Sequence, residues 1–256
     1  MYKKNLNAVY QHIDECIITD SFAKESPINN FWFGCSCEGD CLNQNDCFCF
    51  DQYFVAYNND GTLKNLQSSE PLYECNDCCS CGSSCGNRIF QQGSKGVYEV
   101  FTTQNRGMGL RTVEFIKKGA FVIEYIGELL CDAEARFRSA NMKPTESNYI
   151  LVLREHFGEK VLKTCIDAGR YGNYARFINH SCEPNLSIVP VRFNNSIPHA
   201  ALFSLHNIEA GEELTFSYAG NVPESADVEE IEIRKKCFCG SISCSEKLPF
   251  TLNAFS

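Results

Sequence analysis

Cysteine is the residue type with the most evident chemistry in this chain, which holds seventeen cysteines among 256 residues. Ten of them fall within residues 35–85, and three more fall within residues 237–244. A disulfide framework is one interpretation, but the count is odd, the N-terminus lacks the apolar stretch of a secretory signal, and several cysteines form C-x-C pairs. Such close neighbours suit metal chelation, so the spacing favours metal binding over disulfides.

The cysteines of residues 35–85 have the number and spacing of a zinc cluster. Tetrahedral zinc takes four ligands, so three zinc ions require twelve ligand positions. Nine cysteines fill these positions when three of them each bridge two ions. The nine are Cys35, Cys37, Cys41, Cys47, Cys49, Cys75, Cys79, Cys81 and Cys85. Cys78 breaks the pattern and is expected to be a thiol that binds no metal. The closed thiolate shells of the cluster leave no open position for chemistry, so a structural role is predicted for the cluster.

Three other segments carry residues suited to ligand binding or catalysis. Residues 106–109 (RGMG) place glycines where the backbone can approach a ligand closely. Residues 179–185 (NHSCEPN) combine an amide, an imidazole and a thiol, and residues 213–218 (ELTFSY) carry two aromatic side chains. Taken singly, the segments are typical of a hairpin turn, a capped turn and core packing. Their presence together with the flanking cysteines favours function over these alternatives.

Together these segments resemble the SET family of protein lysine methyltransferases, and the cysteine zones resemble its pre-SET and post-SET zinc motifs. The resemblance covers roughly residues 33–250 and is to the Su(var)-type histone lysine methyltransferases. Residues 149–156, 190–192 and 248–250 are most similar to the subgroup fused to a mariner transposase. The resemblance implies methyl transfer from S-adenosylmethionine to a lysine amine. It also implies a β-clip fold in which residues 179–182 and the final strand form a pseudoknot.

The resemblance assigns roles to individual residues. It implies cofactor contacts from Arg106, Gly107, Met108, Tyr149, Arg176, Asn179, His180 and Phe238. It implies that Tyr218 orients the substrate amine, that Tyr125 assists, and that Phe216 sets the number of methyl groups. It also implies a fourth zinc ion, bound by Cys182, Cys237, Cys239 and Cys244. This ion would order the C-terminal segment over the active site. Met108 stands where the family often has tryptophan, and Ser217 where it usually has aspartate.

Two positions bear on the product and the substrate. In the resembling family, a phenol at the position of Phe216 binds a water that crowds the amine, so phenylalanine there predicts di- or trimethylation. Arg154 stands where relatives that act on lysine 9 of histone H3 tend to be acidic. This keeps lysine 36 and lysine 4 as alternatives to lysine 9. A solvated surface arginine at a shifted register is the other interpretation of Arg154.

The residues between the two cysteine zones predict a mostly β domain with few short helices. Runs rich in β-branched and aromatic residues predict strands at 120–126, 149–153, 160–166, 186–193, 200–205 and 214–218. Residues 132–140 predict a helix with Asp132 as its N-cap. The expected organisation is an N-terminal arm (1–30), an irregular pre-SET zinc-cluster lobe (31–97), a SET catalytic domain (98–219), an acidic linker (220–232) and a small post-SET zinc segment (233–250).

The net charge of the chain limits the kinds of partner that it is expected to bind. The formal net charge is −9, and zinc-bound thiolates would make the protein more acidic still. Phosphate contacts need Lys and Arg, so direct sequence-specific DNA binding is not expected, whereas a basic histone H3 tail or a nucleosome is a suitable partner. No apolar run reaches the length of a membrane span. A monomer in the nucleus, on chromatin, is expected. A non-histone lysine methyltransferase and a catalytically silent chromatin-binding zinc module are the alternatives.

Overall fold

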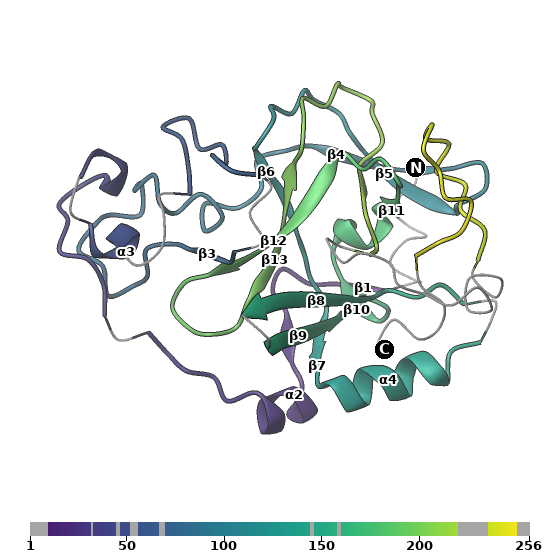
Figure 1. Cartoon of the computed structure of the whole chain (residues 1–256), viewed down its shortest axis with the longest axis horizontal. Helices are drawn as coiled ribbons and strands as arrows, with labels where there is room; N and C mark the ends of the chain where they lie inside the picture. The colour runs from purple at the N-terminus through teal and green to yellow at the C-terminus, as the bar shows by residue number, and fades with distance from the viewer. Residues whose placement is uncertain are drawn as a thin grey trace.

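The computed structural model describes residues 10–31, 33–44, 47–51, 56–66, 70–143, 146–157, 160–219 and 235–249. Its strands are β1 (Gln11–His12), β2 (Ile17–Ile18), β3 (Leu72–Tyr73), β4 (Tyr98–Thr102), β5 (Met108–Thr112), β6 (Phe121–Tyr125), β7 (Glu128–Leu130), β8 (Ile150–Phe157), β9 (Lys160–Asp167), β10 (Tyr171–Gly172), β11 (Asn179–His180), β12 (Leu186–Arg192), β13 (His199–Ser204) and β14 (Thr215–Phe216). Its helices are α2 (Asp20–Glu25), α3 (Phe48–Asp51) and α4 (Asp132–Ala140), with 3-10 turns η1 (Cys41–Asn43) and η2 (Tyr174–Phe177). The predicted mostly β class is confirmed (Figure 1). Within the described residues, no helix has the length and apolar character to cross a membrane.

The larger sheet brings together segments that are far apart in the sequence. Its strand order is β11-β14-β12-β13-β6, with β3 pairing to β12. The late strand β14 pairs in parallel with β11 on one side and with β12 on the other. A strand inserted between two earlier ones is the arrangement that the expected pseudoknot requires, and it is a rare exception to unthreaded connections. It places residues 179–182 directly beside residues 215–218.

A second sheet has the order β2-β7-β9-β8, and helix α4 begins beside the end of β7 and contacts β9 (Figure 1). The helix covers the predicted residues, but its N-cap is Cys131 and the prediction of Asp132 was wrong. Cys131 has the extended backbone of a cap residue, and its Sγ lies 3.4 Å from the Glu134 backbone nitrogen. Asp132 is already helical and instead pairs with Arg136 at 2.6 Å, the spacing at which helix side chains meet.

A buried ion pair connects β8 of this sheet to β12 of the larger one. The Arg192 guanidinium donates to both carboxylate oxygens of Glu155, at 2.5 and 2.7 Å. The side chains are 7% and 1% exposed, so removing either partner would leave a buried charge uncompensated. The pair therefore fixes the position of the β8–β9 hairpin relative to the strands that carry the site.

The N-terminal segment differs from the expected arm. Within it, β1 pairs in parallel with β10, β2 pairs in parallel with β7, and α2 follows directly. Tyr10 and Phe22 are buried in the main hydrophobic cluster, at 7% and 4% exposure. Two-residue strands are too short to leave a periodic signal, because alternation needs several residues to be recognised.

The pre-SET lobe is the part of the molecule around α3 and β3 in Figure 1. A second hydrophobic cluster, which includes Tyr57 and Phe90 of the lobe and Val191 and Phe203 of the large sheet, joins it to the catalytic part. Glu74 reinforces this junction from inside, because its buried carboxylate accepts hydrogen bonds from the Tyr57 hydroxyl at 2.7 Å and the Phe90 backbone at 2.6 Å. The predicted acidic linker, 220–232, lies outside the described residues.

Candidate functional site

The nine predicted cysteines of the pre-SET lobe form one cluster, as expected. The Sγ–Sγ distances are 3.6 Å for Cys35–Cys41 and Cys49–Cys79, 3.8 Å for Cys75–Cys41, and 4.0 Å for Cys35–Cys81. A disulfide brings sulfurs to about 2.05 Å, which these distances exclude for the named pairs. Four thiolates around a zinc with Zn–S bonds of about 2.3 Å lie about 3.8 Å apart, and the cluster matches this spacing.

Within this cluster, three groups of four cysteines have sulfurs close enough to share one ion. They are Cys35, Cys41, Cys75 and Cys81; Cys35, Cys49, Cys75 and Cys79; and Cys35, Cys37, Cys41 and Cys47. Cys35, Cys41 and Cys75 each belong to more than one group, which is the sharing that the ligand count requires. Cys85 is buried in the same cluster but belongs to none of these groups. Cys78 is exposed, and its Sγ points to the Phe31 carbonyl.

The fourth predicted group is also assembled. The sulfurs of Cys182, Cys237, Cys239 and Cys244 all lie within 4.8 Å of one another. The C-terminal segment (residues 235–249) is held beside Cys182 by Ser243, which donates to Glu183 at 2.7 Å. Lys235 reaches the Glu146 carbonyl at 3.3 Å. A metal at these thiols would therefore fix the C-terminal segment against the catalytic part.

The glycine-rich segment lies against the Asn179 segment through a shared carboxylate. Glu213 accepts from Arg106 at 2.6 Å and from the Asn179 side-chain amide at 3.0 Å. The same amide donates to the Met108 carbonyl at 3.1 Å. Gly107 has a φ of +69°, a conformation that favours glycine, so this residue allows the turn that brings Arg106 to Glu213. In the sequence Glu213 was only a member of a motif, and the structure makes its carboxylate the link between Arg106 and Asn179.

His180 connects the C-terminal cysteines to the catalytic strand. Burial, and then the Arg106 charge, lower its pKa to about 4, so the imidazole is neutral at neutral pH. Its Nδ1 accepts from the Tyr218 backbone N–H at 3.2 Å, which places the remaining proton on Nε2. Nε2 lies 3.5 Å from the Cys182 sulfur. The ring therefore spans from a metal-ligand candidate to the backbone of a catalytic candidate.

Among the three catalytic candidates, the Phe216 ring contacts both tyrosines. Ring centroids are 6.4 Å apart for Tyr125–Phe216 and 5.0 Å apart for Phe216–Tyr218. The Tyr125 hydroxyl donates to the Tyr149 carbonyl at 2.7 Å, and the Tyr218 hydroxyl donates to the Ile178 carbonyl at 3.2 Å. Tyr218 is 38% exposed overall, yet its hydroxyl is desolvated, and burial raises the pKa of both phenols above the usual value of 10. Both groups are therefore hydrogen-bond donors at neutral pH.

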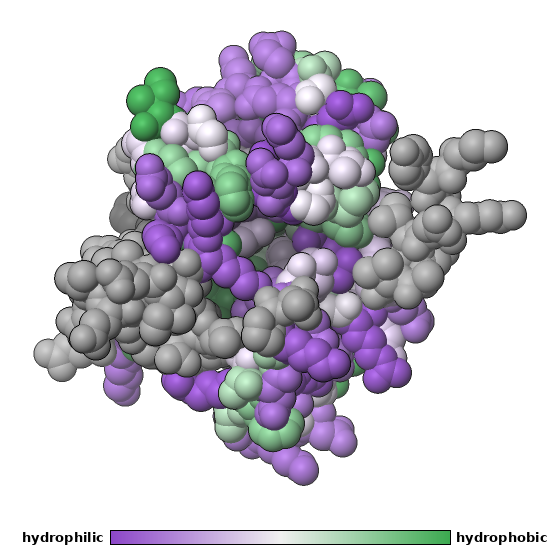
Figure 2. Space-filling model, turned by 90° about the vertical axis from the view of Figure 1, so that its right-hand side faces the viewer, coloured by the Kyte–Doolittle hydropathy of each residue, from purple (hydrophilic) through white to green (hydrophobic). Residues whose placement is uncertain are grey.

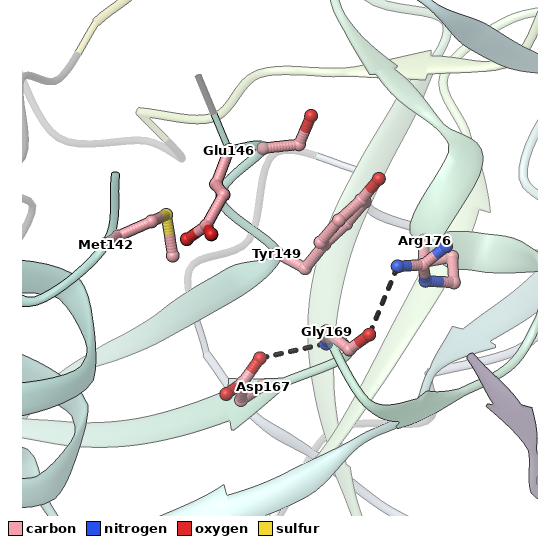
Figure 3. A pocket seen from close by; sticks show the side chains of 7 residues that line it. Met142, Glu146, Tyr149, Asp167, Gly169 and Arg176 are labelled. Atoms are coloured by element: carbon pink, nitrogen blue, oxygen red, sulfur yellow. Dashed lines mark hydrogen bonds between the residues drawn. The ribbon is translucent and has the colours of Figure 1, made fainter. Parts of the chain in front are cut away.

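A pocket of about 330 Å³ opens beside these residues, in the size range of small-molecule sites. Its lining includes two cofactor candidates, Tyr149 and Arg176, which lie beside each other (Figure 3), and the Arg176 guanidinium carbon is 3.9 Å from the centroid of the Tyr149 ring. Arg176 donates from Nε to the Ala168 carbonyl at 2.9 Å and from Nη2 to the Gly169 carbonyl at 3.3 Å. Its Nη1 is buried and has no hydrogen-bond partner among the described residues. A buried cationic donor of this kind fits the carboxylate of an amino-acid cofactor such as S-adenosylmethionine.

Two further residues singled out in the sequence, Phe238 and Arg154, are not among the residues that line the pocket. Phe238 is 45% exposed, and Lys236 Nζ lies over its ring at 5.4 Å. Arg154 is half-buried on β8, where burial lowers its pKa, so the alternative of a freely solvated arginine does not hold. The face that carries the C-terminal segment is mostly hydrophilic and is hollowed near its middle (Figure 2).

Comparison with known proteins agrees with this geometry. A model described as "SET domain" matches residues 107–219, and one described as "Pre-SET motif" matches residues 2–88. The human histone-lysine N-methyltransferase SETMAR is 40% identical over 85% of this chain, which spans 33% of that relative's length. The probable histone-lysine N-methyltransferase set-23 of Caenorhabditis elegans is 37% identical over 94% of this chain and 97% of its own.

Solved structures support the same relationship. The crystal structure of the methyltransferase domain of human SETMAR superposes with a TM-score of 0.80 at 35% identity. The superposition covers 94% of this chain and 89% of that one. It agrees with the expected likeness to the subgroup fused to a mariner transposase. The chain belongs to the SET-domain family of histone-lysine N-methyltransferases, of the Su(var) type that carries a pre-SET motif.

Proposed function

We propose that this chain transfers methyl groups from S-adenosylmethionine to a lysine of the histone H3 tail, to the di- or trimethyl state, on chromatin in the nucleus. The observation that carries the proposal is the contact between the Tyr125–Phe216–Tyr218 cluster and the Asn179–His180 strand. That strand is linked to the cofactor candidates on one side and to the C-terminal cysteines on the other. A silent binding module would not need this assembly.

The cofactor, when bound, supplies an electrophilic methyl group, and the residues of this chain orient the acceptor. The Tyr218 and Tyr125 hydroxyls, protonated and desolvated, would hold the lysine amine in line with the methyl group. No general base is needed if the amine arrives neutral, and a dry, cation-bearing site favours the neutral amine. An unperturbed lysine has a pKa of about 10.4, below which most of it is protonated. The rate is therefore expected to rise from pH 7 to pH 9, because the fraction of neutral lysine rises with pH. The two phenols stay protonated throughout, because their pKa values lie above that range.

We propose that four zinc ions support the site. The two four-cysteine groups that contain Cys49 and Cys37 would each bind one ion. Cys85, which lies in the same buried cluster, would replace Cys35 in the third group. Cys35, Cys41 and Cys75 would then each bridge two ions, and nine cysteines would serve three zincs. The fourth ion would bind Cys182 and the C-terminal cysteines.

The choice of a histone H3 tail rests on charge and on a structural neighbour. The chain has a net charge of −9, which suits a basic peptide. A structure of KRYPTONITE contains an H3(1-15) peptide and SAH, and it superposes with a TM-score of 0.73 at 28% identity. The half-buried Arg154 would repel an arginine next to the target lysine, which keeps lysine 36 and lysine 4 beside lysine 9.

Methyl transfer onto H3 peptides in which each candidate lysine is blocked in turn tests the proposed function. We expect loss of transfer with one blocked lysine and retention with the others, read by mass spectrometry. Transfer to no histone peptide, combined with transfer to other proteins in an array of lysine peptides, would show that the substrate is non-histone. Absence of any transfer by zinc-loaded protein would support the silent module.

The number of methyl groups depends on Phe216 and gives a further prediction. The ring is 4% exposed and packs against both Tyr125 and Tyr218. A Phe216→Tyr variant would add a hydroxyl that can hold a water in the space of a second methyl group. The expected product is mainly monomethyl-lysine, with the first methyl transfer changed less than about threefold. The product distribution over time, measured by mass spectrometry, checks this; continued trimethylation would contradict the role of Phe216.

A further inference from the structure

Tyr10, which comes from the N-terminal segment, lies against the cofactor candidate Arg176. The Arg176 guanidinium carbon is 4.4 Å from the centroid of the Tyr10 ring and 3.9 Å from that of Tyr149. Phe177 contributes a third ring at 5.1 Å, and it packs edge-to-face with Tyr10 at 5.7 Å. Tyr10 is 7% exposed, so its contact with the cation is desolvated, where a cation–π interaction is strongest.

The backbone holds Tyr10 in this place. Strand β1 pairs with β10, which lies immediately before the turn η2 that carries Arg176. The Gln11 N–H donates to the Arg170 carbonyl at 2.8 Å, and the Ile13 N–H donates to the Gly172 carbonyl at 2.9 Å. The segment therefore fastens the tyrosine ring to the element whose arginine it contacts.

These contacts determine which way the guanidinium is turned. Carbonyls bind Nε and Nη2, aromatic rings contact the planar group, and Nη1 remains buried with no hydrogen-bond partner among the described residues. The neighbouring pocket residue Asp167 does not compete for Arg176, because its carboxylate pairs with Arg138 at 2.8 Å and accepts from the Gly169 N–H at 2.9 Å. Glu146, also at the pocket, is exposed and accepts from the Lys143 N–H at 3.2 Å.

We propose that Tyr10 is a positioning residue for cofactor binding: it holds the Arg176 guanidinium so that Nη1 receives the carboxylate of S-adenosylmethionine. The proposal rests on the proposed function, since it assigns Arg176 to that carboxylate. The N-terminal segment is then part of the cofactor site, although it lies far from the site in the sequence.

Calorimetric binding of S-adenosylhomocysteine to the zinc-loaded protein tests the proposal. Tyr10→Leu is expected to weaken binding roughly five- to tenfold, because it removes a desolvated cation–π contact. Tyr10→Phe keeps the ring and is expected to restore the affinity to within about twofold. Phe22→Leu makes the same kind of buried change elsewhere in the N-terminal segment, and it should leave the affinity unchanged.

A second ligand separates positioning from general loosening of the fold. 5′-Methylthioadenosine has the adenosine and sulfur of the cofactor product but lacks the amino-acid carboxylate. Tyr10→Leu should leave its affinity within about twofold of wild type. Equal weakening for both ligands, or equal effects of Tyr10→Leu and Phe22→Leu, would overturn the proposal. If the wild-type protein binds neither ligand, the proposed function itself fails. If Arg176→Lys binds S-adenosylhomocysteine with unchanged affinity, the assignment of Arg176 to the carboxylate fails.

Discussion

A Tyr218→Phe variant should lose roughly 10²- to 10³-fold in kcat, the effect of removing one well-placed hydrogen-bonding group from a desolvated reaction centre, here a phenol oxygen that can accept from the substrate amine. The hydroxyl donates to the Ile178 carbonyl and is protonated, because burial raises its pKa above the usual value. The ring would still pack against Phe216 and His180, at 5.0 and 5.3 Å. The affinity for S-adenosylhomocysteine should therefore stay within about twofold of wild type, so that the loss lies in turnover.

Single-turnover rates with saturating cofactor and peptide measure this effect without the contribution of product release. Tyr174→Phe is the matched control, since it removes a hydroxyl from another tyrosine that is also 38% exposed. Its kcat should remain within about twofold of wild type. A Tyr218→Phe enzyme that retains half of the wild-type rate would exclude the assigned role of the phenol.

The cysteine groups of the lobe could be predicted from the sequence because their members are close together in the chain and because tetrahedral coordination restricts their number. The catalytic strands could be predicted for a related reason, since short runs of β-branched and aromatic residues identify a strand without its partner. The pairing of Cys182 with the C-terminal cysteines came from the family resemblance, and the structure assembles the same four sulfurs.

Contacts between distant polar residues could not be predicted in this way. Glu155 and Arg192 read as ordinary surface charges on two strands, and only the packing of the two sheets buries them together. Glu213 likewise becomes the partner of Arg106 and Asn179 only when β14 lies beside β11. Tyr10 lies in a segment whose strands are two residues long, so its contact with Arg176 has no local sequence signal. In each case the partner is set by topology, which a single sequence leaves open.

The zinc ion proposed for the C-terminal cysteines gives the second large effect. A Cys182→Ser variant should bind three zinc ions per chain in place of the four proposed, and lose at least roughly 100-fold in activity, because misplacement of a site by about 1 Å can cost this much. The four sulfurs join the C-terminal segment to the Asn179–His180 strand, and Lys235 of that segment reaches the rim of the pocket at Glu146. Without the metal, the segment keeps its exposed hydrogen bonds to Glu146 and Glu183, and exposed hydrogen bonds do not offset the entropy of ordering the segment.

Cys35→Ser should behave differently, since Cys35 would bridge two of the three zinc ions proposed for the lobe. It is expected to lose more than one zinc ion and to unfold the lobe, because zinc binding of about 10–16 kcal/mol per structural site is coupled to folding. Cys78→Ser is the control, for its thiol is exposed and lies outside the groups. Zinc content by atomic emission, thermal unfolding and methyl transfer distinguish the three variants. Full activity of Cys182→Ser with three zinc ions bound would show that the C-terminal segment completes the site without metal. That result would also exclude the role of His180 as the link between zinc and Tyr218.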